Sequence, residues 1–368
     1  MQKSNVRTSK PRLPPVRVIN TINRIRTGFS KIQKNMVPPP IAMLEMISGQ
    51  WISRTIGVCA QFGVADHIND KPTSSDAIAK KVEANPEALY RVMRALTVVG
   101  IFTEHEGKKF SLTSVGKTLR TDHPQSMRHM AIFQTSFNWA HWGALDYCVK
   151  TGKNAVEHIR GMKPFDYLSK NKEEAEVFDK AMTNISEMEV DSILAVYDFS
   201  KFSTIADIGG GYGAFLASVL NTHPKARGIL YDMPHVVKGS KEYFANAGLT
   251  DRVEIKSGSF FEAVPSGADA YMMKHIIHDW SDEESITILK HIRKQIPQNG
   301  KLLLIETVIP ERNVPNFSKF IDLEMLVVTT GKERTLADYG SLFAKAGFRL
   351  NRAVPSISMA NVIEASPI

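Results

Sequence analysis

The chain has 368 residues, of which 43% are hydrophobic and 23% charged, an ordinary composition for a globular protein of about two domains. No apolar stretch approaches the roughly 18 residues of a membrane span, and no secretory signal is recognisable, so we expect a cytoplasmic protein. The net charge of +8 lies in the N-terminal segment: residues 1–44 hold nine Lys or Arg and no acid, which leaves 37 bases against 38 acids elsewhere. This near-neutral body argues against a nucleic-acid-binding surface on the folded domains, so we expect no nucleic acid partner.

Residues 1–36 form a basic N-terminal extension that contains one candidate helix. Five apolar residues recur at spacings of four and three, and a helix over about 16–34 would gather them in one stripe: Val18, Ile22, Ile25, Phe29 and Ile32. Such a helix could pack on its own chain or on a dimer partner. An Arg-rich, acid-free helix also suits a membrane surface or a targeting signal. Simple disorder is the third alternative.

Residues 37–122 read as a separate helical domain that follows the proline run 38–40. Thr73 to Asp76 look like a helix start, and a second helix opens at Pro86 and runs toward Gly100. Residues 101–104 and 109–112 then read as a β-hairpin, which completes a winged-helix shape. A winged helix can bind DNA, but the apolar residues of 86–99 favour packing in a dimer or around a substrate pocket.

Residues 123–368 form the second predicted domain, which begins with a helical, aromatic-rich segment over 123–200. Aromatic side chains at this density usually form a core, although some could face a planar substrate. From residue 204 strands alternate with helices, which predicts an α/β fold with a doubly wound, mostly parallel sheet. The strands are expected near 204–208, 227–231, 252–256, 268–273 and 301–306, and the helices near 213–221, 235–246, 282–295 and 336–346. Two further strands, 348–352 and 359–365, complete a seven-stranded sheet in which one strand is antiparallel.

The most informative motif is residues 205–214, where an apolar strand ends in Asp207 and a glycine turn opens a helix. Gly209 and Gly211 allow a tight turn and a close approach to a ligand at the carboxyl end of the strand. Asp232 ends the next strand, where a ribose-binding carboxylate belongs. With Ala214 the glycines also satisfy a dinucleotide pattern, so NAD is a rival cofactor. Asp207 favours the cationic S-adenosylmethionine (SAM) over an anionic pyrophosphate.

Candidate catalytic groups follow the later strands. Lys274 and His278 leave the fourth strand at the rim of the cofactor crevice. Glu306 ends the next strand, where a buried acid needs a partner, and Glu333 precedes the last helix. The two cysteines, Cys59 and Cys148, form no metal-spacing motif, and we expect no metal site.

Taken together, these motifs resemble those of the SAM-dependent O-methyltransferases over roughly residues 40–365. The match is carried by the glycine turn, Asp232-Met233-Pro234, Lys274 with residues 278–283, Glu306, and Gly331 to Thr335. The resemblance implies a winged-helix dimerisation domain, a homodimer, and a Rossmann-like domain that transfers a methyl group from SAM to a hydroxyl of a small, aromatic, secondary-metabolite-like acceptor.

The resemblance also implies roles for single residues. Gly209 and Gly211 would line the methionine end of SAM, Asp232 would bind the ribose, Phe260 would lie along the adenine, and Lys274 would contact the cofactor. His278 would be the general base, flanked by Glu306 and Glu333, and Met182 and Met325 would clamp the acceptor. Relatives usually carry an acid where this chain has Ser259, so we expect SAM to bind less tightly without that charge.

Three other functions fit part of the pattern. Some relatives hold SAM while they catalyse decarboxylation, hydroxylation or pericyclisation. A winged helix with a basic tail could belong to a DNA-binding regulator. NAD-dependent oxidoreduction is the third, and Asp207 speaks against it.

Overall fold

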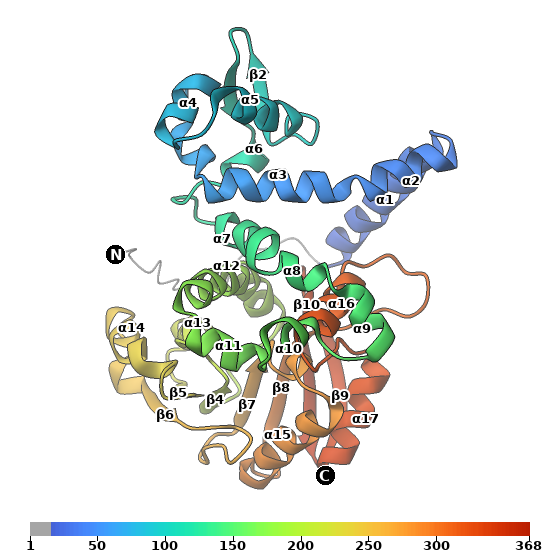
Figure 1. The fold of residues 1–368 in the computed structure, drawn as a ribbon. Coiled ribbons are helices and arrows are strands. Elements are labelled where there is room, and N and C mark those ends of the chain that lie inside the picture. The colour runs from blue at the N-terminus through green and yellow to red at the C-terminus, as the bar shows by residue number, and fades with distance from the viewer. Residues whose placement is uncertain (1–15) are drawn as a thin grey trace. The chain divides into compact units, whose positions relative to one another are not determined.

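The computed structural model describes residues 16–368, which divide into two compact units (Figure 1). Of the described residues, one unit comprises 16–24, 148–154 and 186–368, and the other comprises 25–147 and 155–185. We call them the sheet unit and the helical unit and describe each by itself.

The N-terminal helix α1 (Val16–Asn35) forms where the apolar spacing predicts it. All five stripe residues, from Val18 to Ile32, are exposed, as are Arg24, Arg26 and Lys31. Contact of this stripe with a partner subunit or a membrane surface stays a prediction. Among residues 16–368, every helix is too short or too polar to cross a membrane.

The helical unit contains the predicted wing. Strands β2 (Phe102–His105) and β3 (Lys109–Leu112) pair as an antiparallel hairpin, which confirms that prediction. The structure adds a third strand, β1 (Thr73–Ser74), on the other side of β3. Ser74 nevertheless also starts a helix, because its Oγ accepts a hydrogen bond from the Ala77 amide. Both pairing and capping therefore use the same short segment.

The helices of this unit are short. They are α2 (Pro39–Ile47), α3 (Gly49–Gln61), η1 (Val64–His67), α4 (Ser75–Lys81), α5 (Pro86–Ala95), α6 (Ser114–Lys117), α7 (Arg128–Ile132), the π-helix η2 (Phe133–Phe137), α8 (Trp139–Trp142), α10 (Ala155–Arg160) and α11 (Pro164–Lys170). Of these, α3, α4, α5 and α7 contribute to a core that includes Met93 and Phe110. Helices α9 (Leu145–Thr151) and α12 (Lys172–Val196) contribute to both units.

The sheet unit holds the predicted seven-stranded sheet, with strand order β6-β5-β4-β7-β8-β10-β9. Its strands are β4 (Thr204–Ile208), β5 (Arg227–Asp232), β6 (Val253–Ser257), β7 (Ala270–Lys274), β8 (Lys301–Thr307), β9 (Phe348–Pro355) and β10 (Ala360–Pro367). Strand β10 runs antiparallel to both of its neighbours, and the pairings among β4 to β8 are parallel. The mostly parallel sheet with one antiparallel strand is therefore confirmed.

Helices cover both faces of this sheet, as a doubly wound fold requires. Helices α12, α13 (Ala214–Thr222) and α14 (Ser240–Asn246) contribute to one apolar core, and α15 (Asp282–Gln295) and α17 (Leu336–Ala346) to the other. Alternate residues of one strand enter opposite cores: Met272 lies in the first and Met273 in the second. The helix predicted over 235–246 is shorter, because residues 237–239 form the 3₁₀ turn η3. The remaining elements are η4 (Thr250–Arg252), η5 (Ile277–Asp279) and α16 (Ser318–Val328).

The parallel strands bring four sequence motifs to one edge. Because β4, β5, β7 and β8 pair in parallel, their carboxyl ends lie at the same edge of the sheet, where ligands of open α/β sheets bind. The glycine turn, Asp232, Lys274 and Glu306 therefore leave neighbouring strands at the same edge.

Candidate active site

The glycine turn after β4 is an open cradle. Gly209 (φ 74°) and Gly211 (φ 60°) both adopt the left-handed conformation that side chains disfavour. A β-carbon on Gly211 would meet nothing within 4 Å, whereas one on Gly209 would lie 2.6 Å from the Ile276 side chain. The Gly211 amide donates to Asp232 Oδ2 at 2.9 Å, which ties the turn to the end of β5. The turn therefore offers open backbone beside a fixed carboxylate.

Two acids, buried Asp207 and half-buried Asp232, lie beside this cradle. Asp207 is only 2% exposed, and burial, with the charge of Asp232, raises its pKa to about 7, although Lys274 opposes the shift. Burial also raises the pKa of Asp232, although its hydrogen bonds from the Gly211 and Met233 amides oppose the shift. Two neighbouring carboxylates that are costly to ionise suit a cationic ligand. The residues present therefore fit the ammonium and sulfonium groups of SAM better than a pyrophosphate.

The two residues predicted to contact the adenine, Ser259 and Phe260, lie in the loop after β6. The Phe260 ring packs against Phe261 and Trp280, with ring centroids 5.0 and 6.0 Å apart, and lies 3.7 Å from the position of a β-carbon on Gly209. Ser259 Oγ accepts a hydrogen bond from the Phe261 amide at 3.2 Å. The structure thus places Phe260 next to the cradle, and the Ser259 hydroxyl already serves its own loop.

His278 lies in η5, with two carboxylates near its Nδ1 atom and Asp279 Oδ1 at 3.7 Å from its Nε2 atom. Its Nδ1 atom is 2.9 Å from Glu333 Oε1 and 3.5 Å from Glu306 Oε2. Glu306 Oε1 accepts hydrogen bonds from the backbone amides of Ile276 and Ile277, at 3.0 and 2.8 Å. Glu333 therefore bonds the imidazole directly, whereas Glu306 mainly holds the backbone that carries it.

The electrostatics of the cluster favour a protonated His278 in the free protein. Burial lowers its pKa, but the charges of Glu306 and Asp279 and the hydrogen bond to Glu333 outweigh burial and raise the pKa to about 10. Burial raises the pKa of Asp279 to about 6, although the charge of His278 opposes it. A positive charge bound nearby, or the loss of a carboxylate, would release the proton of His278 at lower pH.

Arg334 belongs to the motif Gly331 to Thr335, but the sequence predicts no role for it. Its guanidinium is buried and donates to the carbonyls of Ile277 and Trp280, each at 3.0 Å, and to Asp282 Oδ1 at 2.8 Å. Gly331, three residues earlier, passes so close that a β-carbon would lie 1.9 Å from the His278 carbonyl oxygen. Residues 331–334 therefore brace the His278 loop as well as supplying Glu333.

Two further residues of the cluster were missed. Glu189, from α12, is 5% exposed, and its Oε2 lies 3.2 Å from Lys274 Nζ and 2.7 Å from His275 Nε2. Lys274, predicted to contact the cofactor, is thus paired with this carboxylate. Nothing local in a helical sequence marks Glu189, although the His275 next to Lys274 could have been noticed.

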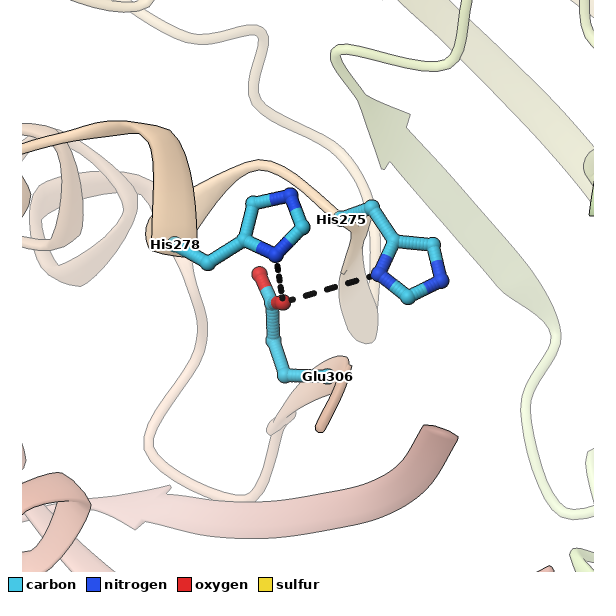
Figure 2. Close-up of side chains that lie close together, drawn as sticks. All are labelled: His275, His278 and Glu306. Carbon is cyan, nitrogen blue, oxygen red and sulfur yellow. Dashed lines mark ion pairs between the residues drawn. The ribbon is translucent and has the colours of Figure 1, made fainter. Parts of the chain in front are cut away.

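Histidine and carboxylate groups in such a cluster are also metal ligands. His275, His278 and Glu306 each offer one donor atom, and these atoms lie within 4.8 Å of one another (Figure 2). However, Nδ1 of His278 is bonded to Glu333 and Nε2 of His275 to Glu189. These contacts favour hydrogen bonds and ion pairs as the role of the cluster.

The two methionines predicted to hold the acceptor lie in different units. Met325, in α16 of the sheet unit, is 7% exposed, and Met182, in the part of α12 that belongs to the helical unit, is 36% exposed. Their joint contact with an acceptor stays a prediction.

Comparisons with known proteins identify the family of the chain. Residues 142–349 match the model of the O-methyltransferase domain, and residues 44–122 that of the O-methyltransferase dimerisation domain. The chain is 39% identical to the phenazine O-methyltransferase PhzM of Lysobacter antibioticus, over 90% of this chain and 97% of that protein. It is 34% identical to the 8-amino-8-demethylriboflavin N,N-dimethyltransferase of Streptomyces davaonensis, over 83% and 89%.

Among solved structures, the fold is similar to that of CalO1, a methyltransferase in calicheamicin biosynthesis solved in its SAH-bound form. The TM-score is 0.80 at 32% identity, over 90% of this chain and 98% of that chain. The O-methyltransferase model matches more than half of the sequence, and the match to a dimerisation domain fits a homodimer. The chain belongs to the O-methyltransferase family, a family of SAM-dependent enzymes that carry a dimerisation domain.

Proposed function

We propose that this protein is a SAM-dependent O-methyltransferase that methylates a phenolic or enolic hydroxyl of a small aromatic acceptor, with His278 as general base. The observation that carries this proposal is the pair His278 and Glu333: Nδ1 is held at 2.9 Å, which leaves Nε2 as the atom that receives a proton. A phenol titrates near ~10 and needs such a base at neutral pH, whereas a neutral amine already presents its electron pair. The base therefore favours oxygen over nitrogen as the acceptor atom.

The cofactor would bind over the glycine turn. Gly209, Gly211 and buried Asp207 would hold its methionine end, Asp232 its ribose, and Phe260 and Ser259 its adenine. SAM supplies the methyl group on a positively charged sulfur, which leaves with the bonding electrons as S-adenosylhomocysteine. Lys274, released from or shared with Glu189, would contact the bound cofactor at the end of β7.

The acceptor oxygen forms its new bond to carbon while His278 Nε2 takes the hydroxyl proton. Glu333 accepts a hydrogen bond from Nδ1–H. Once the positive charge of the bound cofactor has lowered the pKa of His278, the neutral imidazole therefore keeps its proton on Nδ1 and can accept one at Nε2. The imidazolium that forms is then stabilised by Glu333 and Glu306, the same groups that raise its pKa. The experiment that tests this function is a screen of phenolic and enolic compounds with labelled SAM, scored for methylated product and S-adenosylhomocysteine.

Replacing Glu333 by Gln should shift the pH dependence of the rate. Only neutral His278 accepts a proton, so the rate rises as pH passes its pKa in the complex. The Glu333 carboxylate raises this pKa, and its neutral isostere should move the acid-side midpoint of kcat to lower pH by roughly 1–3 units. The measurement is a pH–rate profile at saturating SAM. A midpoint that stays in place or moves upward would contradict the role of Glu333.

Replacing Ser259 by Asp should tighten SAM binding. A carboxylate can accept the adenine amino group with charge assistance, and such bonds are roughly twice as strong as neutral ones. We expect the Kd for SAM to fall by about threefold to tenfold, as measured by calorimetry. A Ser259→Asn variant is the uncharged control. Equal or weaker binding by the Asp variant would show that this loop does not contact the adenine as proposed.

Other chemistries make distinct predictions. A family member that decarboxylates, hydroxylates or cyclises its substrate would turn over without stoichiometric S-adenosylhomocysteine. An N-methyltransferase would accept aryl amines in the same screen and would tolerate loss of His278. Binding of DNA would appear as a salt-dependent titration.

The apolar surface of α2 and α3 supports the predicted homodimer. Met43, Leu44, Ile47 and Trp51 are all more than half exposed, and α3 and the end of α2 lie within the segment that matches the dimerisation model. Large apolar side chains gathered on one segment usually mark a protein interface.

A further inference from the structure

The imidazole of His275 lies at the centre of a row of charged groups of alternating sign. Figure 2 shows Glu306 between the two imidazoles, 3.8 Å from His275 Nδ1 and 3.5 Å from His278 Nδ1. On the far side His275 Nε2 meets Glu189. From end to end, the row runs Lys274, Glu189, His275, Glu306, His278, Glu333. His275 is thus the link between the Lys274 pair and the proposed base.

The backbone is strained to put this imidazole there. His275 directly follows β7 with φ 53°, in the left-handed region that costs a non-glycine residue roughly 1–2 kcal/mol. Its amide donates to the Ile305 carbonyl at 3.0 Å, which extends the pairing of β7 with β8. The His275 and His278 rings stack with centroids 5.2 Å apart and planes 25° apart. The strain is therefore retained at a position where the ring reaches the catalytic cluster.

The surroundings of His275 favour its charged form. Glu189 is buried; burial raises its pKa, but His275 and Lys274 outweigh burial and lower the pKa to about 2. Burial lowers the pKa of His275. The charge of Glu189, its hydrogen bond to the ring, and the Glu306 carboxylate 3.8 Å from Nδ1 outweigh burial and raise the pKa, while Lys274 opposes them. Glu189 therefore stays ionised and holds a cationic ring beside the catalytic one.

We propose that His275 is a positioning residue: its imidazolium, held by Glu189, steadies Glu306 and weakens the hold of His278 on the proton that it removes. This inference rests on the proposed role of His278 as general base. A positive ring stacked on His278 repels a second positive charge there, and it also neutralises part of the Glu306 charge that would stabilise that charge. Both effects have the same sign, so they bring the base nearer to its neutral, active form.

The groups that face His275 set the direction of the effect. They are Glu189 on α12, Lys274 on β7, Glu306 on β8, and His278 and Asp279 in η5. Substituting His275 leaves every other charge in place. The proton of His278 should then be held more tightly, and the enzyme should need a higher pH to become active.

The test is a pH–rate profile of the full-length enzyme carrying His275→Asn, at saturating SAM and acceptor. Asn tolerates the left-handed conformation, so the backbone of the loop can be kept. We expect the acid-side midpoint of kcat to rise by about 1 unit, and kcat at high pH to return to within a few fold of wild type. His105→Asn, an exposed histidine of the wing, should leave the profile unchanged.

A second variant keeps the imidazole and removes its support. Glu189→Gln deprives His275 of its negative partner, so His275 loses its proton at lower pH. The acid-side midpoint of kcat should therefore again rise. An unchanged or lowered midpoint in His275→Asn, or a loss of rate that is equal at every pH, would overturn the inference. Failure of the proposed function is distinguishable: in that case His278→Ala itself would retain activity, whatever His275→Asn does.

Discussion

His278→Ala should lower kcat by roughly 10² to 10⁴, while the Kd for SAM stays within about twofold of wild type. The reason is that Nε2 is the only atom of this imidazole left for proton transfer, since Nδ1 is bonded to Glu333 at 2.9 Å. The cradle for SAM uses other residues, so cofactor binding should survive. The measurements are initial rates at saturating SAM and acceptor, and calorimetric titration with SAM.

A matched variant gives the control for this result. His105→Ala removes an exposed histidine of the wing and should keep the wild-type rate. Loss of both SAM affinity and rate in His278→Ala would assign His278 to the structure of the site. Retention of the rate would remove it from the mechanism altogether.

Gly331→Ala should lower kcat almost as much as His278→Ala does, although Gly331 is not a reacting group. A β-carbon there would lie 1.9 Å from the His278 carbonyl oxygen and 2.5 Å from both Asp279 C and Trp280 N. These are backbone atoms, so the loop must move and carry His278 with it. A displacement of about 1 Å at a reacting group can cost 10²-fold, and we expect a kcat loss of that order together with about 1–3 kcal/mol of stability.

The matched substitution is Gly340→Ala, in α17. Its β-carbon would lie 3.7 Å from the Leu350 side chain, an ordinary contact, so the exchange should stabilise the helix by about 0.5–1 kcal/mol and leave kcat unchanged. Urea unfolding and steady-state rates measure both effects. A Gly331→Ala enzyme with wild-type rate would show that the loop adjusts without moving His278.

The sequence predicts most of the sheet unit because its signals are local. Strand patterns of five or six residues place β4 to β8 within one or two residues of their observed bounds. The two-residue strand β1 escapes such reasoning, since its pairing with β3 depends on tertiary contact and Ser74 carries a helix-start signal at the same time. The 3₁₀ turn over 237–239 is missed for a similar reason.

The candidate site shows the same division. The glycine turn, Asp232, His278 and Glu306 could be named from sequence because each ends, or closely follows, a strand that is itself predictable. The sequence could not tell which carboxylate bonds His278, because Glu306 and Glu333 have the same chemistry. Only the distances from His278 Nδ1 distinguish them: 2.9 Å to Glu333 Oε1 and 3.5 Å to Glu306 Oε2. Glu189 lay beyond reach, since its partners are 85 and 86 residues away in sequence and its helix gives no sign of them.

Burial and hydrogen bonding of Glu306 make the stability of the fold depend on pH in the acid range. Its fully buried carboxylate anchors the amides of Ile276 and Ile277, and despite burial, which raises its pKa, the nearby His278 and His275 lower it below the ordinary value of 4.5. A carboxyl group whose pKa is lower in the folded state stabilises the fold above its unfolded pKa and loses that contribution as pH falls through its folded pKa. The loop that carries His278 is thus held by a carboxylate that can be protonated, and strong acid would loosen this loop.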